Sequence, residues 1–178
     1  MKHNLIVMIG PSGIGKSYLA KHILDTHEDC TIVSRDAIRF AKLQEGDDYF
    51  KYEDEVEANY YNAISAAIQT HEYVIADATH ITKKSRRKLF SNISLPSGTK
   101  VIGVYVEAPL STALRQNAMR TGRARVPEDV IKRMFKQKVS PQENEPFDEV
   151  IYVSKDADMA LGNGSDGIKT VFEKLEQI

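Results

Sequence analysis

The sequence has one cysteine, no tryptophan and no long apolar segment. The single cysteine, Cys30, excludes an internal disulfide and a zinc site made of cysteines alone. The apolar run Leu5–Ile9 is far too short to cross a membrane or to form the core of a signal peptide. We therefore expect a cytoplasmic protein with no membrane partner.

Internal repeats and low-complexity tracts are also missing, and the composition is that of a globular protein. The chain has 178 residues, of which 42% are hydrophobic and 28% are charged. These values are ordinary for a soluble protein, and a chain of this length can bury a substantial core. We expect a single domain over residues 1–178, and the sequence indicates no oligomeric state.

The net charge is only −1, but its sign is unevenly distributed along the chain. Between Thr82 and Lys138 there are 14 Lys and Arg residues against three acidic ones, so this block carries +11 and the rest −12. A basic block in an otherwise acidic chain favours an anionic partner on one side of the molecule. Solvated helix surface is the alternative explanation, and we interpret the acidic stretch Glu45–Glu57 as solvated surface as well.

Strand-like and helix-like segments alternate along the chain. Short apolar runs predict five strands, at Leu5–Ile9, Thr31–Val33, Tyr73–Ala76, Val101–Val106 and Glu149–Val153. Helical spacing between them includes a long helix over Tyr52–His71 and a last helix that ends near Gln177. This alternation predicts an α/β fold with a five-stranded parallel sheet and helices on both faces. Ligands of such sheets bind beyond the carboxyl ends of the strands, so we expect the functional site there.

The first strand leads into Gly10-Pro-Ser-Gly-Ile-Gly-Lys-Ser17, which fits the phosphate-loop pattern G-x-x-x-x-G-K-[ST]. Glycines let backbone N–H groups approach phosphate oxygens, and the following helix directs its positive end at the anion. Lys16 supplies a positive charge to the β- and γ-phosphates, and Ser17 supplies a hydroxyl to Mg²⁺. The motif predicts ATP and Mg²⁺ as cofactors, bound by Gly10, Ser12, Gly13, Ile14, Gly15, Lys16 and Ser17.

Two missing features narrow the class of phosphate-loop protein. There is no Asn-Lys-x-Asp segment of the kind that reads guanine in GTPases. The third predicted strand ends Ala76-Asp77-Ala78, without the Glu that motor-type ATPases place after the aspartate to position a water. Both features favour phosphoryl transfer to an acceptor over hydrolysis.

The second predicted strand ends in Ser34-Arg-Asp-Ala-Ile-Arg39. Asp36 lies at a strand end across from the phosphate loop, where a carboxylate can accept a proton from an acceptor hydroxyl. Arg39 follows three residues later, on the same side of the helix that begins there, and can hold a substrate phosphate by two hydrogen bonds. Asp is also among the best N-caps, so a purely structural role for Asp36 stays open.

Arginines crowd a short turn between two predicted helices, at about residues 120–127. Arg115, Arg120, Arg123 and Arg125 surround Gly122 in this turn. Arginines that swing over a transferring phosphoryl group stabilise its charge and exclude water, which predicts an arginine-rich lid. A merely soluble turn is the alternative.

A second basic run, Lys83–Lys88, follows Asp77 closely. At the start of a helix near the active edge of the sheet it can bind a nucleic-acid backbone, or it can form a solvated face. His80 has no partner at metal-ligand spacing, and we expect it to be a polar loop residue.

These motifs occur in the order phosphate loop, SRDAIR, VIADATHITKKSRRKL and RQNAMRTGRARVP. Together they resemble the kinase domain of phage T4-type polynucleotide kinases, within the adenylate-kinase-like group of phosphate-loop kinases. The resemblance covers about residues 4–153. It implies that Asp36 is the general base for a 5′-hydroxyl and that Arg39 contacts the neighbouring phosphate of the acceptor. Lys16 and Ser17 would serve ATP and Mg²⁺.

The resemblance also implies roles for residues later in the chain. Asp77 would support the active site on the substrate side, and Arg86 and Arg87 match two arginines of the family segment that would contact the acceptor. Arg120 or Arg123 would stabilise the transferring phosphate. Either arginine can match the family residue, because this turn is one residue longer than the family pattern.

The sequence therefore predicts an ATP-dependent phosphotransferase that moves the γ-phosphate of ATP to a 5′-hydroxyl end of DNA or RNA. Two alternatives stay open. One is a kinase of a small hydroxylated metabolite, nucleoside or antibiotic. The other is a nucleotide-dependent binding or switch protein without phosphoryl transfer.

Overall fold

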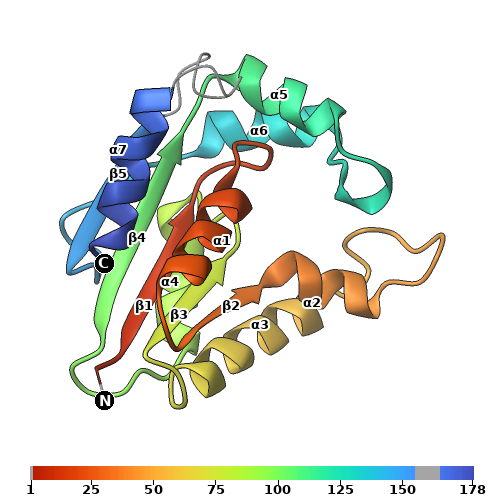
Figure 1. Ribbon diagram of the computed structural model, residues 1–178. Coiled ribbons are helices and arrows are strands. Elements are labelled where there is room, and N and C mark those ends of the chain that lie inside the picture. The colour runs from red at the N-terminus through yellow and green to blue at the C-terminus, as the bar shows by residue number, and fades with distance from the viewer. Residues whose placement is uncertain (1, 155–164) are drawn as a thin grey trace.

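The structure is a computed structural model that describes residues 2–154 and 165–178, built around one parallel sheet (Figure 1). Its strands are β1 (Asn4–Ile9), β2 (Cys30–Ser34), β3 (Tyr73–Asp77), β4 (Lys100–Glu107) and β5 (Glu149–Ser154). They lie in the order β2-β3-β1-β4-β5, and every pairing is parallel. The predicted α/β fold with a five-stranded parallel sheet is confirmed.

Helices connect the strands and cover both faces of the sheet (Figure 1). They are α1 (Lys16–Thr26), α2 (Arg35–Lys42), α3 (Glu53–Ala67), α4 (Lys83–Asn92), α5 (Leu110–Ala118), α6 (Glu128–Gln137) and α7 (Ser165–Glu176), with the short 3-10 helix η1 (Gly122–Ala124) between α5 and α6. The segment Gly162–Gly167, which is rich in glycine and predicts a turn before the last helix, lies partly outside the described residues, and α7 begins within it. Across residues 2–154 and 165–178, no helix is long and apolar enough to cross a membrane.

The alternation of side chains along β1 explains why this strand is apolar throughout. Leu5 and Val7 belong to the core between the sheet and α3 and α4, whereas Ile6 and Met8 belong to the core on the face covered by α1, α6 and α7. All four side chains are fully buried. Burial of one such side chain contributes about 1.5–3 kcal/mol, so β1 is fixed at the centre of the sheet. The phosphate loop thus begins from a rigid strand.

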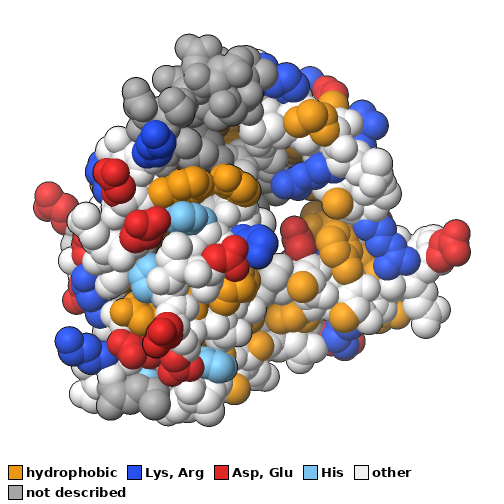
Figure 2. Space-filling view, viewed as in Figure 1, with side chains coloured by type: hydrophobic (Ala, Val, Ile, Leu, Met, Phe, Trp, Pro, Cys, Tyr) orange, Lys and Arg blue, Asp and Glu red, His pale blue; other side chains and the backbone are white. Residues whose placement is uncertain are grey.

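Two segments lie beyond the carboxyl ends of the strands. One is the connection between α2 and α3, residues 43–52, which we call the acceptor loop. The other is the lid, residues 120–127, between α5 and α6. They face each other on the same side of the molecule in Figure 1, and the surface between them is hollowed in Figure 2, with basic, acidic and hydrophobic side chains around the hollow.

Candidate active site

The phosphate loop takes its shape from glycines in left-handed backbone conformations. Gly13 has a φ of 85° and Gly15 a φ of 87°, where a side chain is strained. At Gly13 a Cβ would also stand 2.7 Å from the carbonyl oxygen of Ala113, so the loop packs tightly against α5. Gly15 precedes α1 and provides no side-chain cap. No capping side chain therefore occupies the start of α1, where an anion-binding loop directs backbone N–H groups and the positive end of the helix at its ligand.

Lys16, Ser17 and Asp77 meet at the end of this loop. The Lys16 side chain is buried, and its Nζ donates to the carbonyl oxygen of Pro11 at 2.8 Å. Ser17 Oγ donates to Asp77 Oδ2 at 2.8 Å. Burial raises the pKa of the Asp77 carboxyl, an effect that the Lys16 charge and the Ser17 hydrogen bond partly oppose. The structure therefore joins the end of β3 to the phosphate loop.

The pair Ser17 and Asp77 fits a Mg²⁺ ion bound together with a nucleotide. Mg²⁺ prefers oxygen ligands, and in nucleotide sites it takes one or two of them from the protein and the rest from phosphates and water. One hydroxyl and one carboxylate supply this set. Among residues 2–154 and 165–178 there is no group of three or more His, Cys, Asp or Glu that could hold a metal ion without a nucleotide.

Asp36 lies at the start of α2 but does not cap it. The N-cap is Ser34, whose side chain accepts a hydrogen bond from the backbone N–H of Ala37 at 3.2 Å. The capping role left open for Asp36 is therefore wrong. The Asp36 side chain is 58% exposed and borders the cavity beside the phosphate loop.

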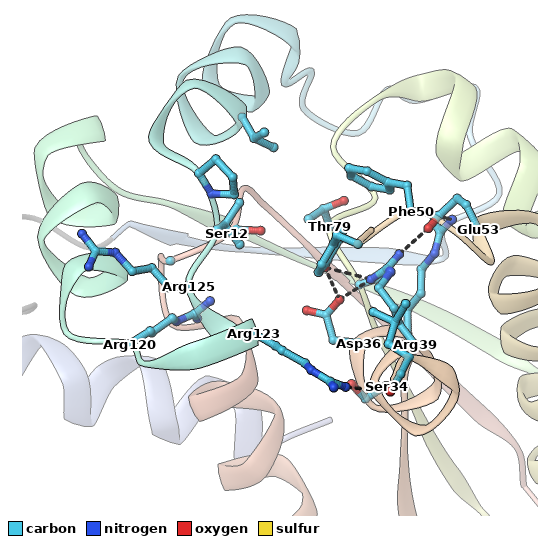
Figure 3. A pocket seen from close by; sticks show the side chains of 18 of the residues that line it. Ser12, Ser34, Asp36, Arg39, Phe50, Glu53, Thr79, Arg120, Arg123 and Arg125 are labelled. Carbon is cyan, nitrogen blue, oxygen red and sulfur yellow. Dashed lines mark hydrogen bonds and ion pairs between the residues drawn. The ribbon is translucent and has the colours of Figure 1, made fainter. Parts of the chain in front are cut away.

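A cavity of about 600 Å³ brings most of the predicted residues together (Figure 3). From the phosphate loop and β3 it is lined by Ser12, Gly13, Gly15, Lys16, Ser17 and Asp77, from α2 by Asp36 and Arg39, and from the lid by Arg120, Arg123 and Arg125. Gly10 and Ile14 do not line it. The N–H of Gly10 donates to the carbonyl oxygen of Thr79 at 2.8 Å, and the Ile14 side chain is fully buried in the core. These two residues shape the loop from behind.

Arg39 lies where the sequence predicts, on the same side of α2 as Asp36, but other groups hold its guanidinium. Nη1 forms an ion pair with Asp36 Oδ1 and donates to Tyr49 Oη at 2.9 Å, and Nη2 donates to Glu53 Oε2 at 2.8 Å. The side chain is only 6% exposed. Arg39 therefore acts here as a link between α2, the acceptor loop and α3.

Two of the three lid arginines, Arg120 and Arg123, point to different ends of the cavity (Figure 3). Arg120 donates to the carbonyl oxygen of Ala124 within the lid at 3.4 Å. Burial raises the pKa of Asp77, and the charge of Arg120 opposes that rise slightly. Arg123 reaches across the cavity and donates to the carbonyl oxygen of Leu43, just after α2, at 2.7 Å. Arg120 thus lies on the side of Asp77, and Arg123 ties the lid to the acceptor loop.

The sequence-based prediction that Arg86 contacts the acceptor is wrong. Its side chain is fully buried, so it cannot reach an acceptor in this structure. It forms a two-point ion pair with Glu145 and donates to the carbonyl oxygens of His80, Val139 and Ser140. It thus joins α4 to the loop after β3 and to the segment after α6. Arg87 is exposed and lies outside the cavity lining, and its predicted role stays a prediction.

His80 lies in the loop between β3 and α4, as the sequence predicts, but it is not solvated. It is buried, with a φ of 44°. Its Nδ1 lies 2.8 Å from the carbonyl oxygen of Met8, and its Nε2 lies 3.2 Å from Tyr60 Oη. Nδ1 therefore carries the proton and Nε2 accepts from Tyr60. Burial lowers the pKa of His80 to about 4, so the ring is neutral and structural.

The acceptor loop, the start of α3, the end of the lid and α6 supply cavity residues that the sequence analysis missed. Acidic and aromatic side chains come from the stretch interpreted as solvated surface, namely Asp47, Asp48, Tyr49, Phe50 and Glu53. An apolar patch comes from Val126, Pro127, Val130 and Met134. The adjacent aromatic residues Tyr49 and Phe50 could have indicated that this stretch lines a site, because such a pair is unusual in a purely solvated acidic stretch.

Solved structures of several kinases resemble this fold. A gluconokinase from Sinorhizobium meliloti 1021 has a TM-score of 0.58 and 19% identity, over 97% of this chain and 95% of that one. A sugar kinase from Janibacter sp. HTCC2649 has a TM-score of 0.58 and 14% identity, over 95% of each chain. A fungal RNA kinase has a TM-score of 0.60 and 16% identity, and the match covers 99% of this chain and 49% of that one. At these identities the likeness establishes a P-loop kinase fold and no more.

Comparison with curated proteins gives no match. A family model described as AAA domain matches residues 5–141. This match spans more than half of the chain and includes the phosphate loop, Asp36, Asp77 and the lid. The protein therefore belongs to the AAA domain family.

Proposed function

We propose that the protein is an ATP-dependent kinase that transfers the γ-phosphate of ATP to an acceptor hydroxyl. The observation that carries this proposal is that Asp36 and Lys16 line one cavity, from two different walls. Ser34 caps α2, which leaves the Asp36 carboxylate available for a ligand. A phosphate held by the loop and a hydroxyl held by Asp36 would share this space.

Each residue of the site has a separate task in this proposal. Lys16 and the N–H groups at the start of α1 bind the phosphates, and Arg120 stabilises the charge that spreads over the transferring group. Asp36 accepts the proton of the attacking hydroxyl. Ser17 and Asp77 would hold Mg²⁺, which would neutralise phosphate charge when bound.

For the acceptor we propose a 5′-hydroxyl end of DNA or RNA. The order of the four motifs supports this choice. So does the part of the cavity lining that comes from the end of the lid and from α6, where Val126, Val130 and Met134 offer apolar side chains that suit a nucleobase. One protein of similar fold is described as a fungal RNA kinase, and a nucleic-acid acceptor is compatible with this fold.

A small hydroxylated molecule is the second candidate, and the contacts of Arg39 favour it. That guanidinium is engaged by Asp36, Tyr49 and Glu53, so a neighbouring acceptor phosphate would have to displace a carboxylate. Arg86 is buried, and Asp47 and Asp48 add negative charge to the acceptor side. An uncharged small acceptor needs no free cation there.

Labelled ATP distinguishes these functions. The protein is incubated with Mg²⁺ and either a 5′-hydroxyl oligonucleotide, the corresponding free nucleoside or a panel of sugars and hydroxylated antibiotics. We expect label on the oligonucleotide, with an acceptor KM that rises steeply with salt, because only a polymer releases many counterions on binding. Label only on small molecules supports the second candidate. Nucleotide binding without transfer to any acceptor favours a switch protein and overturns the kinase.

A further inference from the structure

The side chains of Asp36, Arg39 and Tyr49 form a closed triangle at the acceptor end of the cavity, and Figure 3 labels Asp36 and Arg39. Tyr49 Oη donates to Asp36 Oδ1 at 2.9 Å. Arg39 Nη1 donates to the same oxygen and, at 2.9 Å, to Tyr49 Oη. The Arg39 guanidinium also lies over the Tyr49 ring, 4.5 Å from its centroid. Each corner of the triangle therefore contacts both of the others.

The two donors both bind Oδ1, which leaves the other oxygen of Asp36 for a ligand. The last torsion of an aspartate side chain is broad, so a single hydrogen bond leaves the carboxylate free to turn. Donors from two different segments, α2 and the acceptor loop, fix the carboxylate plane. No hydrogen bond to Oδ2 is found among residues 2–154 and 165–178, although the Asp36 side chain is 58% exposed.

Tyr49 is itself held in place and stays a donor. Its ring packs edge-on against Phe50, with the centroids 4.8 Å apart. Arg39 Nη2 donates to Glu53 Oε2 at 2.8 Å, and this contact fixes the guanidinium that packs against the Tyr49 ring. Burial and the neighbouring Asp36 carboxylate raise the pKa of Tyr49 well above its usual range. The hydroxyl therefore keeps its proton at neutral pH.

We propose that Tyr49 is a positioning residue, which orients the Asp36 carboxylate so that its second oxygen receives the acceptor hydroxyl. This inference rests on the proposed kinase function. Tyr49 acts through Asp36, and it neither accepts the phosphoryl group nor holds the nucleotide. Arg39 shares the task from α2, and the acceptor loop thereby becomes part of the catalytic apparatus.

The test compares wild type with Tyr49→Phe, which removes one oxygen and keeps the ring on Arg39. The substrates are saturating ATP with Mg²⁺ and whichever probe wild type phosphorylates, the 5′-hydroxyl oligonucleotide or the nucleoside. We expect kcat to fall about tenfold, while KM for ATP and for the acceptor change less than about twofold. Tyr52→Phe is the matched control, because it removes a hydroxyl three residues away that lies outside the cavity lining, and its kinetics should equal those of wild type.

A double variant separates positioning from general support of the fold. In the Asp36→Asn background there is no base to orient, so adding Tyr49→Phe should leave the residual rate unchanged. An equal loss in both backgrounds overturns the proposal, as does a Tyr49→Phe enzyme with wild-type kcat. Phosphate on Tyr49 by mass spectrometry after incubation with ATP alone also overturns it, because Tyr49 would then be an acceptor. If wild type phosphorylates nothing, the proposed function falls and this inference falls with it.

Discussion

Ser17 Oγ and Asp77 Oδ2 lie 2.8 Å apart, which joins the second residue of α1 to the last residue of β3. The two residues are 60 positions apart in the sequence. They meet because β1 and β3 are neighbouring parallel strands whose carboxyl ends share one edge. Burying the Asp77 carboxylate here lowers the stability of the fold. A residue with a purely structural role would not be expected to lower stability, so this cost points to a functional role.

Asp77→Asn should raise the stability of the protein without ligands and lower its activity. The folded state raises the pKa of Asp77, so the ionised carboxyl destabilises the fold at neutral pH relative to a neutral group. An amide keeps an oxygen for the Ser17 hydroxyl and removes the buried charge. We expect a gain of about 0.5–2 kcal/mol in the free energy of unfolding, measured in urea without nucleotide. Phosphoryl transfer should fall together with its dependence on Mg²⁺. A less stable variant would contradict the cost assigned to this charge.

Asp36→Asn should remove catalysis and spare nucleotide binding. General bases contribute about 10²–10⁴-fold to a rate, so kcat should fall by that factor. The affinity for a non-hydrolysable ATP analogue, measured by calorimetry, should stay within about twofold of wild type, because the phosphate loop is untouched. The control is Asp54→Asn, an exposed carboxylate in the first turn of α3 that lies outside the cavity lining. Wild-type turnover in Asp36→Asn would remove Asp36 from the mechanism.

Arg86→Met should destabilise the protein strongly. The change leaves the carboxylate of Glu145, whose side chain is 5% exposed, without its ion-pair partner. Breaking a buried ion pair in this way costs about 3–5 kcal/mol. Arg87→Met, one residue further on the exposed side of α4, should change stability by less than about 0.5 kcal/mol. Urea denaturation of both variants tests the assignment, and equal stabilities would show that Arg86 is not a structural link.

His80 should make the fold sensitive to acid. Its folded pKa of about 4 lies below the unfolded value near 6.5, so the neutral ring stabilises the protein fully above pH 6.5. This contribution is lost as the pH falls from 6.5 towards 4, by about 2 kcal/mol at pH 5. In His80→Asn, whose side chain tolerates the left-handed backbone, the gap in stability from wild type should shrink by about that amount between pH 7 and pH 5. Unfolding curves at the two pH values check this, and a constant gap would contradict it.

The lid arginines should differ in their kinetic effects. Arg120→Ala should lower kcat about 10²-fold or more with little change in acceptor KM, because the arginine acts on the transferring group. Arg123→Ala removes the hydrogen bond to the Leu43 carbonyl across the cavity. It should mainly raise acceptor KM, by several-fold, because the lid is no longer tied to the acceptor loop. Steady-state kinetics with each substrate varied in turn measures both effects, and identical profiles would mean that the two arginines act together.

The strands were predictable because buried parallel strands carry a continuous apolar signal. The predicted run Leu5–Ile9 corresponds to β1, Asn4–Ile9, and Val101–Val106 corresponds to β4, Lys100–Glu107. The phosphate loop was equally clear, because its glycines, lysine and serine are contiguous. Asp36 was identified as a candidate, but only the structure showed that Ser34 takes the capping role.

Residue type alone could not predict that Arg86 is buried and Arg87 is exposed. Successive positions on a helix differ by about 100°, so one neighbour can face the core while the next faces solvent. Arg86 lies three residues before the buried Leu89, on the same face of α4. That spacing was a usable signal, but its buried partner Glu145 lies 59 residues away and no local pattern points to it.

The sequence by itself determined the order of strands and helices, the anion-binding loop and the position of a carboxylate at the end of β2, because contiguous residues encode each of them. Only the tertiary structure decided which charged side chains can contact a ligand. In the folded protein Arg86 is buried, and Arg39 forms ion pairs with Asp36 and Glu53. Arg123 donates a hydrogen bond to the carbonyl oxygen of Leu43 across the cavity, and Tyr49 donates one to Asp36. The physical reason is that a charged side chain takes its function from the partners and the solvent around it, and packing brings those together from distant parts of the chain.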